Sequence, residues 1–145
     1  MNNSLPHRIL LVQQTDAIQA QLVASLEQLG MDVVSIADCA LAMPSFREED
    51  IDIVMIDIDF PEDRGIDLLG KMAADPRELP LIGLSRRKSM ADVLAAVRHG
   101  ASDYLMLPTE KHAVIKHVLD RALERGALKR ENLAYRNKLE SANRE

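Results

Sequence analysis

Short apolar runs alternate with stretches of helical periodicity along most of this sequence. The clearest run, residues 51–57, has the length and the β-branched content of a buried strand. Asp16 precedes a stretch with apolar residues at helical spacing, and Gly30 follows it, in the places of an N-cap and a C-terminal stop. Along the whole chain the pattern predicts strands at 8–13, 33–36, 51–57, 79–84 and 103–107, and helices at 17–29, 38–47, 66–74, 89–99 and from about 110 onward.

Strands that alternate with helices indicate right-handed βαβ units and a parallel sheet covered by helices on both faces. Five such strands predict a single small doubly wound α/β domain with an extended C-terminal helix. In sheets of this kind the functional crevice lies at the carboxyl ends of the strands. The residues expected around one pocket at that edge are Gln13, Gln14, Asp57, Asp59, Ser85 and Leu107.

Composition narrows the class of protein. The chain has 145 residues, and its single cysteine excludes a disulfide framework and a multi-cysteine metal site. No apolar run approaches the roughly 18 residues that a membrane span needs, and the N-terminus lacks the features of a secretory signal. We therefore expect a soluble, cytoplasmic protein with no membrane partner.

The charges are unevenly distributed along the chain. Residues 1–119 carry 11 Lys and Arg against 18 Asp and Glu, whereas residues 120–145 carry 7 against 5. An acidic body with only 3% aromatic residues lacks the basic face and the stacking side chains of nucleic-acid binders. We therefore expect no nucleic-acid partner.

Four segments, in this order along the chain, resemble the receiver domain of bacterial two-component response regulators. They are Ile9-Leu10-Leu11-Val12, Ile56-Asp57-Ile58-Asp59-Phe60-Pro61 with Gly65, Leu84-Ser85, and the stretch from Gly100 to Pro108. The resemblance covers residues 8 to about 123 and implies the flavodoxin-like or CheY-like (βα)5 fold. It also implies a phosphoacceptor position at Asp57, a switch hydroxyl at Ser85 and a switch aromatic at Tyr104.

The pocket departs from the family pattern at three positions. Two acidic residues that hold Mg²⁺ in the family are Gln13 and Gln14 here, and the lysine that pairs with the phosphoryl group is Leu107. Phosphoryl transfer to a carboxylate needs a divalent cation and a positive side chain, and Mg²⁺ prefers charged oxygen ligands. We therefore expect a degenerate site that has lost its phosphoacceptor function. We expect no catalytic residue, no metal site and weak or absent Mg²⁺ binding.

Two alternatives stay open from the sequence. In the first, Asp57 still accepts a phosphoryl group with unusual pocket ligands, and Arg86, directly after Ser85, supplies the lost positive charge. In the second, Asp57-Ile58-Asp59 is the Asp-x-Asp motif of a small phosphatase that resembles the haloacid dehalogenases. That family has Thr or Val where Pro61 stands, and its motif lies on the first strand, so we favour a protein that is not an enzyme.

The last helix changes its pattern after about residue 123. Apolar and small residues then recur at spacings of 4, 3, 4 and 3, which is typical of a coiled-coil seam. With Asn132 at an a position, Glu124–Lys129 and Glu131–Arg136 become pairs of opposite charge between parallel helices. We expect a homodimer through this seam, which consists of Leu128, Asn132, Tyr135, Leu139 and Ala142.

These patterns predict three segments: a tail at 1–7, a receiver domain at 8–123 and a helical coiled-coil linker at 124–145. The seam continues to the last residue, so we expect a longer native protein with an output domain after the linker. The linker resembles that of RssB-like regulators, which join a receiver to a PP2C-type phosphatase, and similar linkers precede diguanylate cyclase and HD-GYP domains. The function expected is an atypical response regulator receiver that dimerises, controls this output domain and has a sensor kinase as a further partner. Its partner surface would be formed by residues 90–100, 103–106 and 110–123.

Overall fold

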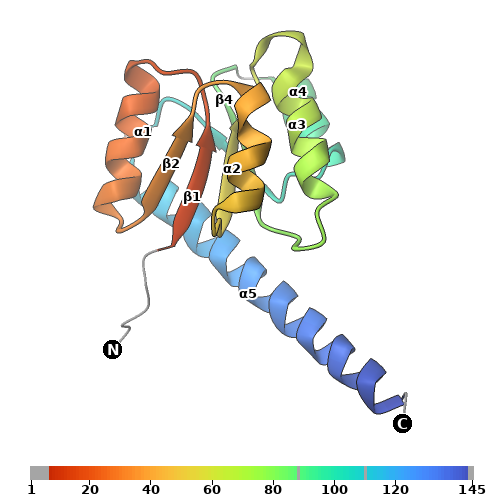
Figure 1. The fold of residues 1–145 in the computed structure, drawn as a ribbon. Coiled ribbons are helices and arrows are strands. Elements are labelled where there is room, and N and C mark those ends of the chain that lie inside the picture. The colour runs from red at the N-terminus through yellow and green to blue at the C-terminus, as the bar shows by residue number, and fades with distance from the viewer. Residues whose placement is uncertain (1–6, 88, 110, 144–145) are drawn as a thin grey trace.

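The structure is a computed structural model that describes residues 7–87, 89–109 and 111–143. Five parallel strands form one sheet in the order β2-β1-β3-β4-β5, with helices on both faces (Figure 1). This architecture confirms the predicted fold class. The strands are β1 (Arg8–Val12), β2 (Asp32–Ile36), β3 (Ile53–Asp57), β4 (Leu81–Ser85) and β5 (Asp103–Met106). The helices are α1 (Ala17–Gln28), α2 (Ala42–Glu48), α3 (Arg64–Ala73), α4 (Met90–Arg98) and α5 (His112–Asn143), with short 3₁₀ turns η1 (Cys39–Leu41) and η2 (Pro61–Asp63).

Side-chain caps fix where two of the helices begin. The Asp16 carboxylate accepts a hydrogen bond from the Gln19 backbone N–H at 2.9 Å, and the Ser89 hydroxyl accepts one from the Asp92 backbone N–H at 3.3 Å. Each bond satisfies one of the backbone donors that a helix leaves unpaired in its first turn. The same polar residues that mark helix starts in the sequence therefore set them in the fold.

The predicted helix at 38–47 is divided into two pieces. Asp38 accepts a hydrogen bond from the Ala40 backbone N–H at 3.0 Å and starts the short turn η1. The regular helix α2 then begins at Ala42, with Pro44 in its first turn, where the missing N–H of proline has no helical partner to lose. Local side-chain bonding therefore replaces one helix with a turn and a shorter helix.

Alternate residues of the central strands face the two helical layers. On one face, Leu10 and Ile56 belong to a cluster with residues of α2, α3 and α4. On the other, Leu11 and Met55 belong to a cluster with residues of α1 and α5. Because β3 is buried along its whole length, the residue at its end, Asp57, is held in a fixed place at the carboxyl edge of the sheet.

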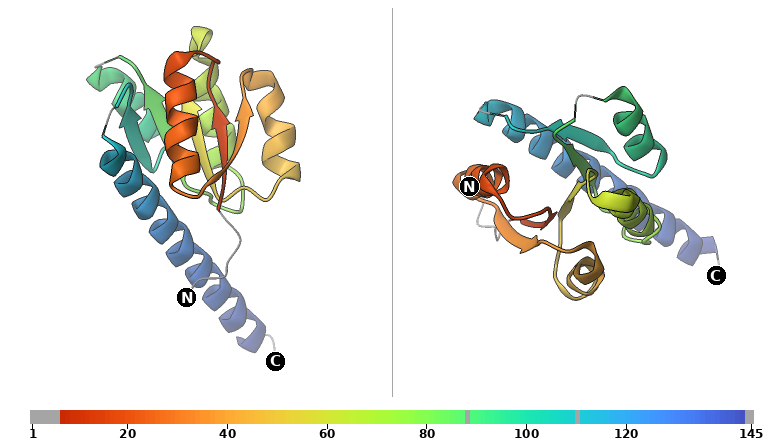
Figure 2. Two further views of the ribbon diagram at one scale, coloured as in Figure 1. Left: turned by 90° about the vertical axis from the view of Figure 1, so that its left-hand side faces the viewer. Right: turned by 90° about the horizontal axis from the view of Figure 1, so that it is seen from above.

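Helix α5 has two parts with different surroundings. Its first turns pack on the sheet through Ile115, Val118, Leu119 and Ala122, all of which are buried. Arg121 forms an ion pair with Asp103 at 3.4 Å. Beyond Gly126, which is still buried, the helix runs away from the body of the domain (Figures 1 and 2). With 32 residues, α5 is about 48 Å long, and none of the helices in the described ranges is long and apolar enough to cross a bilayer.

Candidate functional site

The carboxyl edge of the sheet brings Asp57, Asp59, Ser85 and Arg86 into one hydrogen-bonded group. Asp57 ends β3 and Ser85 ends the neighbouring strand β4. Asp59 lies in the turn after β3, and Arg86 starts the loop that leads to α4. Four of the residues predicted from sequence therefore meet, because parallel neighbours end at the same edge.

The Asp57 carboxylate is largely enclosed, with 5% of the residue exposed. Its Oδ1 accepts a hydrogen bond from the Asp59 backbone N–H at 2.8 Å. Burial raises the pKa of the Asp57 carboxyl above its ordinary value, and the negative charge of Asp59 raises it further. The hydrogen bond from Asp59 and the positive charge of Arg86 oppose this rise in the pKa of Asp57. Asp57 is therefore an acid whose charged form is poorly solvated.

The Asp59 carboxylate connects β3 to the loop after β4. Its Oδ1 accepts a hydrogen bond from the Ser85 hydroxyl at 3.0 Å, and its Oδ2 accepts one from the Arg86 backbone N–H at 2.8 Å. The Ser85 Oγ in turn accepts a hydrogen bond from the Arg87 backbone N–H at 3.0 Å. Both oxygens of Asp59 are therefore committed to the start of the β4–α4 loop.

The guanidinium of Arg86 is directed to the N-cap of α1. Its Nη1 and Nη2 donate to the two carboxylate oxygens of Asp16 at 2.5 and 2.9 Å. This pairing lowers the pKa of Asp16 and raises the pKa of Arg86. The charge of Arg86 is felt by Asp57, but its hydrogen bonds go to Asp16.

The three residues that depart from the family pattern lie in different surroundings. Gln13 is 2% exposed, and within the part of the chain that the structure describes, neither its Oε1 nor its Nε2 has a hydrogen-bond partner. Gln14 is exposed. Leu107 belongs to the core cluster that includes residues of α1 and α5. The structure therefore places Gln13 inside the fold, Gln14 at the surface and Leu107 in the core.

Tyr104, on β5, is half-buried and packs beside Gly83 of β4. Its hydroxyl is enclosed next to Ser85, without a hydrogen bond of good geometry among the residues described. Burial raises the pKa of Tyr104, and the negative charges of Asp59 and Asp92 raise it further. The hydroxyl therefore points inward, toward the Asp59–Ser85 pair.

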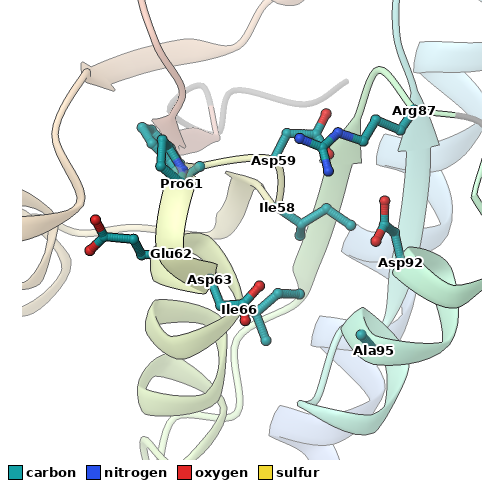
Figure 3. Close-up of a pocket in the computed structure, with 10 residues that line it drawn as sticks. Ile58, Asp59, Pro61, Glu62, Asp63, Ile66, Arg87, Asp92 and Ala95 are labelled. Carbon is teal, nitrogen blue, oxygen red and sulfur yellow. The ribbon is translucent and has the colours of Figure 1, made fainter.

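A cavity of about 200 Å³ lies between η2, the start of α3 and helix α4 (Figure 3). Asp92 and Arg87 line it beside Asp59, and sequence reasoning missed both, because nothing in the pattern shows that α4 comes close to η2. In the described ranges, no three His, Cys, Asp or Glu side chains are placed to share a metal ion. The cavity is lined by Ile58, Asp59, Phe60, Pro61, Glu62, Asp63, Ile66, Arg87, Asp92 and Ala95.

The predicted dimer seam is only partly described. Leu128, Tyr135 and Leu139 are exposed on α5. The side chains of Asn132 and Ala142 lie outside the described residues. Arg125, which would occupy an a position, donates instead to the Ser102 carbonyl of its own domain. The dimer stays a prediction, and its seam would begin after Arg125.

Comparison with known proteins identifies the family. The sequence model of the response regulator receiver domain matches residues 9–119. DNA-binding response regulator MtrA of Mycobacterium tuberculosis is 29% identical over 116 residues, which are 80% of this chain and 50% of MtrA.

Two solved structures show the same likeness. NtrX from Brucella abortus has a TM-score of 0.80 at 26% identity, covering 90% of this chain and 29% of that chain. The receiver domain of the sensor histidine kinase PA1611 from Pseudomonas aeruginosa PAO1, with a magnesium ion coordinated in its active site cleft, has a TM-score of 0.73. It is 27% identical, covering 82% of this chain and 98% of that domain.

These relatives correct the expectation that nucleic acid is not a partner. MtrA is a DNA-binding protein by name, and this chain spans about half its length. The expectation was wrong because it rested on the charge of 145 residues. An acidic receiver is compatible with a regulator whose other half binds DNA.

Proposed function

Because this chain belongs to the family of response regulator receiver domains, we propose that it controls an output domain without normal Mg²⁺-dependent phosphorylation of Asp57. The family membership argues against the small phosphatase as a second reading of Asp57-Ile58-Asp59. Receiver domains are in general signalling domains and not enzymes. The observation that carries the proposal is the set of oxygens left free at the carboxyl edge of the sheet.

That set does not fit Mg²⁺. The ion demands near-octahedral geometry, keeps several waters and is usually bound through one or two carboxylates. Among the residues that the structure describes, Asp57 is the one buried carboxylate in the crevice, and one of its oxygens already accepts the Asp59 amide. Asp59 is committed to Ser85 and Arg86, and Gln13 offers a neutral amide. The charge of Asp59 lies nearby, but its oxygens are occupied, so one free oxygen of Asp57 and one amide are left as ligands, which we take to be too few to hold the ion.

The positive charge that phosphoryl transfer needs is also displaced. Leu107 fills a place in the core, and Arg86 is bound at both terminal nitrogens by Asp16. A phosphoryl group on Asp57 would have to compete with Asp16 for that guanidinium. The two missing acidic residues and the missing lysine therefore remove the metal ligands and the phosphate-binding charge together. Signalling then passes through protein contacts.

Two surfaces support control of an output domain. Helix α4 exposes Met90, Leu94 and Val97 on the face away from the sheet, and the distal half of α5 exposes Leu128, Tyr135 and Leu139. We infer that the first binds partners and that the second joins two copies in a parallel coiled coil. The likeness to MtrA supports a DNA-binding output domain.

One observation favours the alternative, a receiver still phosphorylated on Asp57. The buried amide of Gln13 has no partner among the described atoms, and a buried polar group without a partner is unfavourable. A cation in the crevice could be bound by the Gln13 Oε1, whereas the Nε2 would need an acceptor. The alternative therefore predicts that Mg²⁺ binds the unmodified protein.

An Mg²⁺ titration followed by amide NMR tests the proposal. For the wild-type chain we expect no saturable shift at Asp57 or Gln13 with millimolar Mg²⁺. The double variant Gln13→Asp/Gln14→Asp restores two carboxylates and should gain a saturable response, which serves as the positive control. Saturable binding by the wild type would contradict the proposal.

A further inference from the structure

We propose that the Asp59 carboxylate is a built-in acceptor that fixes the end of β4 at Ser85 and Arg86, and the position of Tyr104 beside it, while Asp57 is unmodified. The inference deepens the proposed function and rests on it. It assigns a positioning role to a residue that the receiver resemblance leaves without one.

Asp59 forms a bridge, the pair of hydrogen bonds from its carboxylate to Ser85 and Arg86. Asp59 is anchored at its own backbone, because its N–H donates to Asp57 Oδ1 at 2.8 Å. From that anchor its two oxygens reach Ser85 and Arg86, which follow it by 26 and 27 residues in the chain. Hydrogen bonds to an ionised carboxylate are roughly twice as strong as neutral ones. The loop after β4 is therefore tied to the loop after β3 at two adjacent points.

The donor proton of the Ser85 hydroxyl is already used. This hydroxyl has one proton to donate, and the Asp59 oxygen at 3.0 Å is closer than the Arg87 carbonyl at 3.3 Å and carries charge. The hydroxyl oxygen already accepts the Arg87 N–H, and the residue is 1% exposed. An anionic oxygen that a phosphoryl group would offer to Ser85 is thus supplied by Asp59.

The contacts of Asp59 also bear on Tyr104 of β5. Tyr104 pairs with Gly83 on β4, two residues before Ser85, and its hydroxyl is buried. The negative charge of Asp59 contributes to the raised pKa of Tyr104. Helix α4 begins at Met90, five residues after Ser85, and the Arg86 side chain ties the same loop to Asp16. Fixing Ser85 and Arg86 therefore fixes the strand end beside which the Tyr104 hydroxyl lies.

The other acids around the cavity lack these contacts. Glu62 and Asp63 extend from η2, and Asp92 from α4 (Figure 3). The hydrogen bonds of the Ser85 hydroxyl and of the Arg86 amide go to Asp59. Asp59 is therefore the member of this acidic group that a single substitution can test.

Fluorine NMR of the chain labelled with 3-fluorotyrosine gives the readout. The sequence has two tyrosines: Tyr104 beside the bridge, and the exposed Tyr135 on distal α5 as an internal reference. In Asp59→Ala we expect the Tyr104 resonance to move or broaden while that of Tyr135 stays. Ser85→Ala should also move or broaden the Tyr104 resonance, and the double variant should change it by less than the sum of the two, because both variants remove the Ser85–Asp59 bond.

Amide hydrogen exchange gives a second readout. Loss of the charged acceptor should speed exchange of the Arg86 N–H by roughly tenfold to a hundredfold. Asp59→Asn should retain much of the protection, because its amide oxygen can still accept from Arg86 and its NH₂ can donate to Ser85. This conservative variant separates positioning from a general loss of folding, which circular dichroism monitors for every variant.

Asp67→Ala is the matched control, since it removes an exposed carboxylate from the first turn of α3. Unchanged Tyr104 and Arg86 signals in Asp59→Ala, or equal changes in Asp67→Ala, would overturn the inference. No phosphodonor or Mg²⁺ is present in these measurements. Failure of the bridge is therefore read separately from failure of the proposed function, which the Mg²⁺ titration decides.

Discussion

Gly65 shows how closely single residues determine the crevice. A Cβ at this position would lie 2.1 Å from the Asp57 carbonyl oxygen, so only glycine lets the start of α3 approach the end of β3. We expect Gly65→Ala to lower the free energy of unfolding by about 1–3 kcal/mol in urea denaturation. Gly70→Ala is the control, because its Cβ would meet His99 at an ordinary 3.7 Å. Equal stability of wild type and Gly65→Ala would contradict this account.

Asp57 gives a prediction in pH. Burial raises its pKa in the folded state, so the folded chain holds this proton more tightly than the unfolded chain does. The cost of the charged carboxylate is absent below its ordinary pKa of 3.8 and appears as the pH rises through the folded value. Asp57→Asn removes the charge and keeps an oxygen for the Asp59 amide.

We therefore expect Asp57→Asn to be more stable than wild type at neutral pH, with a difference that shrinks as the pH is lowered. Urea denaturation at a series of pH values measures it, and Asp67→Asn on the exposed side of α3 is the control. A difference that is constant with pH, or that grows on acidification, would show that burial does not govern Asp57.

At the scale of elements, Asp16 has two roles that substitutions can separate. It caps α1 through the Gln19 amide and pairs with Arg86. Asp16→Asn keeps a capping oxygen, whereas Asp16→Ala loses it, so Asp16→Ala should cost about 1 kcal/mol more in the free energy of unfolding. The comparison is made by urea denaturation in 0.5 M salt, which screens the half-exposed ion pair. Equal stability of the two variants would rule out the cap as a contributor.

Local signals in the sequence predicted the helices and strands well, but they did not predict the contacts between distant elements. Apolar runs marked the strands, and Asp16 and Ser89 marked helix starts, because these effects act within a few residues. The bond from Arg86 to Asp16 spans 70 positions, and it depends on how loops meet at the sheet edge. The pattern grouped Asp57, Asp59 and Ser85, but it did not show the hydrogen bonds between them.

At the scale of the whole molecule, the distal half of α5 is the proposed dimer contact. Leu139 is exposed there at a predicted a position. We expect Leu139→Lys to weaken self-association by at least about tenfold, because it replaces an apolar seam residue with a charge. Sedimentation equilibrium measures this, and Leu41→Lys on η1 is the control for an exposed leucine elsewhere. A wild-type chain that stays monomeric at high concentration would contradict the dimer.

The error about nucleic acid also belongs to this scale. Charge along 145 residues describes the surface of the receiver and says nothing of the other half of a protein the length of MtrA. The receiver fold follows from local patterns within the chain, whereas the charge of the chain does not identify its partners. Family likeness supplied what the pattern of charges could not.

The central claim is that Asp57 is not phosphorylated in the normal Mg²⁺-dependent way. Intact mass spectrometry after incubation with acetyl phosphate and Mg²⁺ tests it most directly, with Asp57→Asn treated in parallel. We expect no phosphate-sized gain in mass for either protein. A gain in the wild type that is absent from Asp57→Asn would contradict it and show that the receiver still accepts a phosphoryl group.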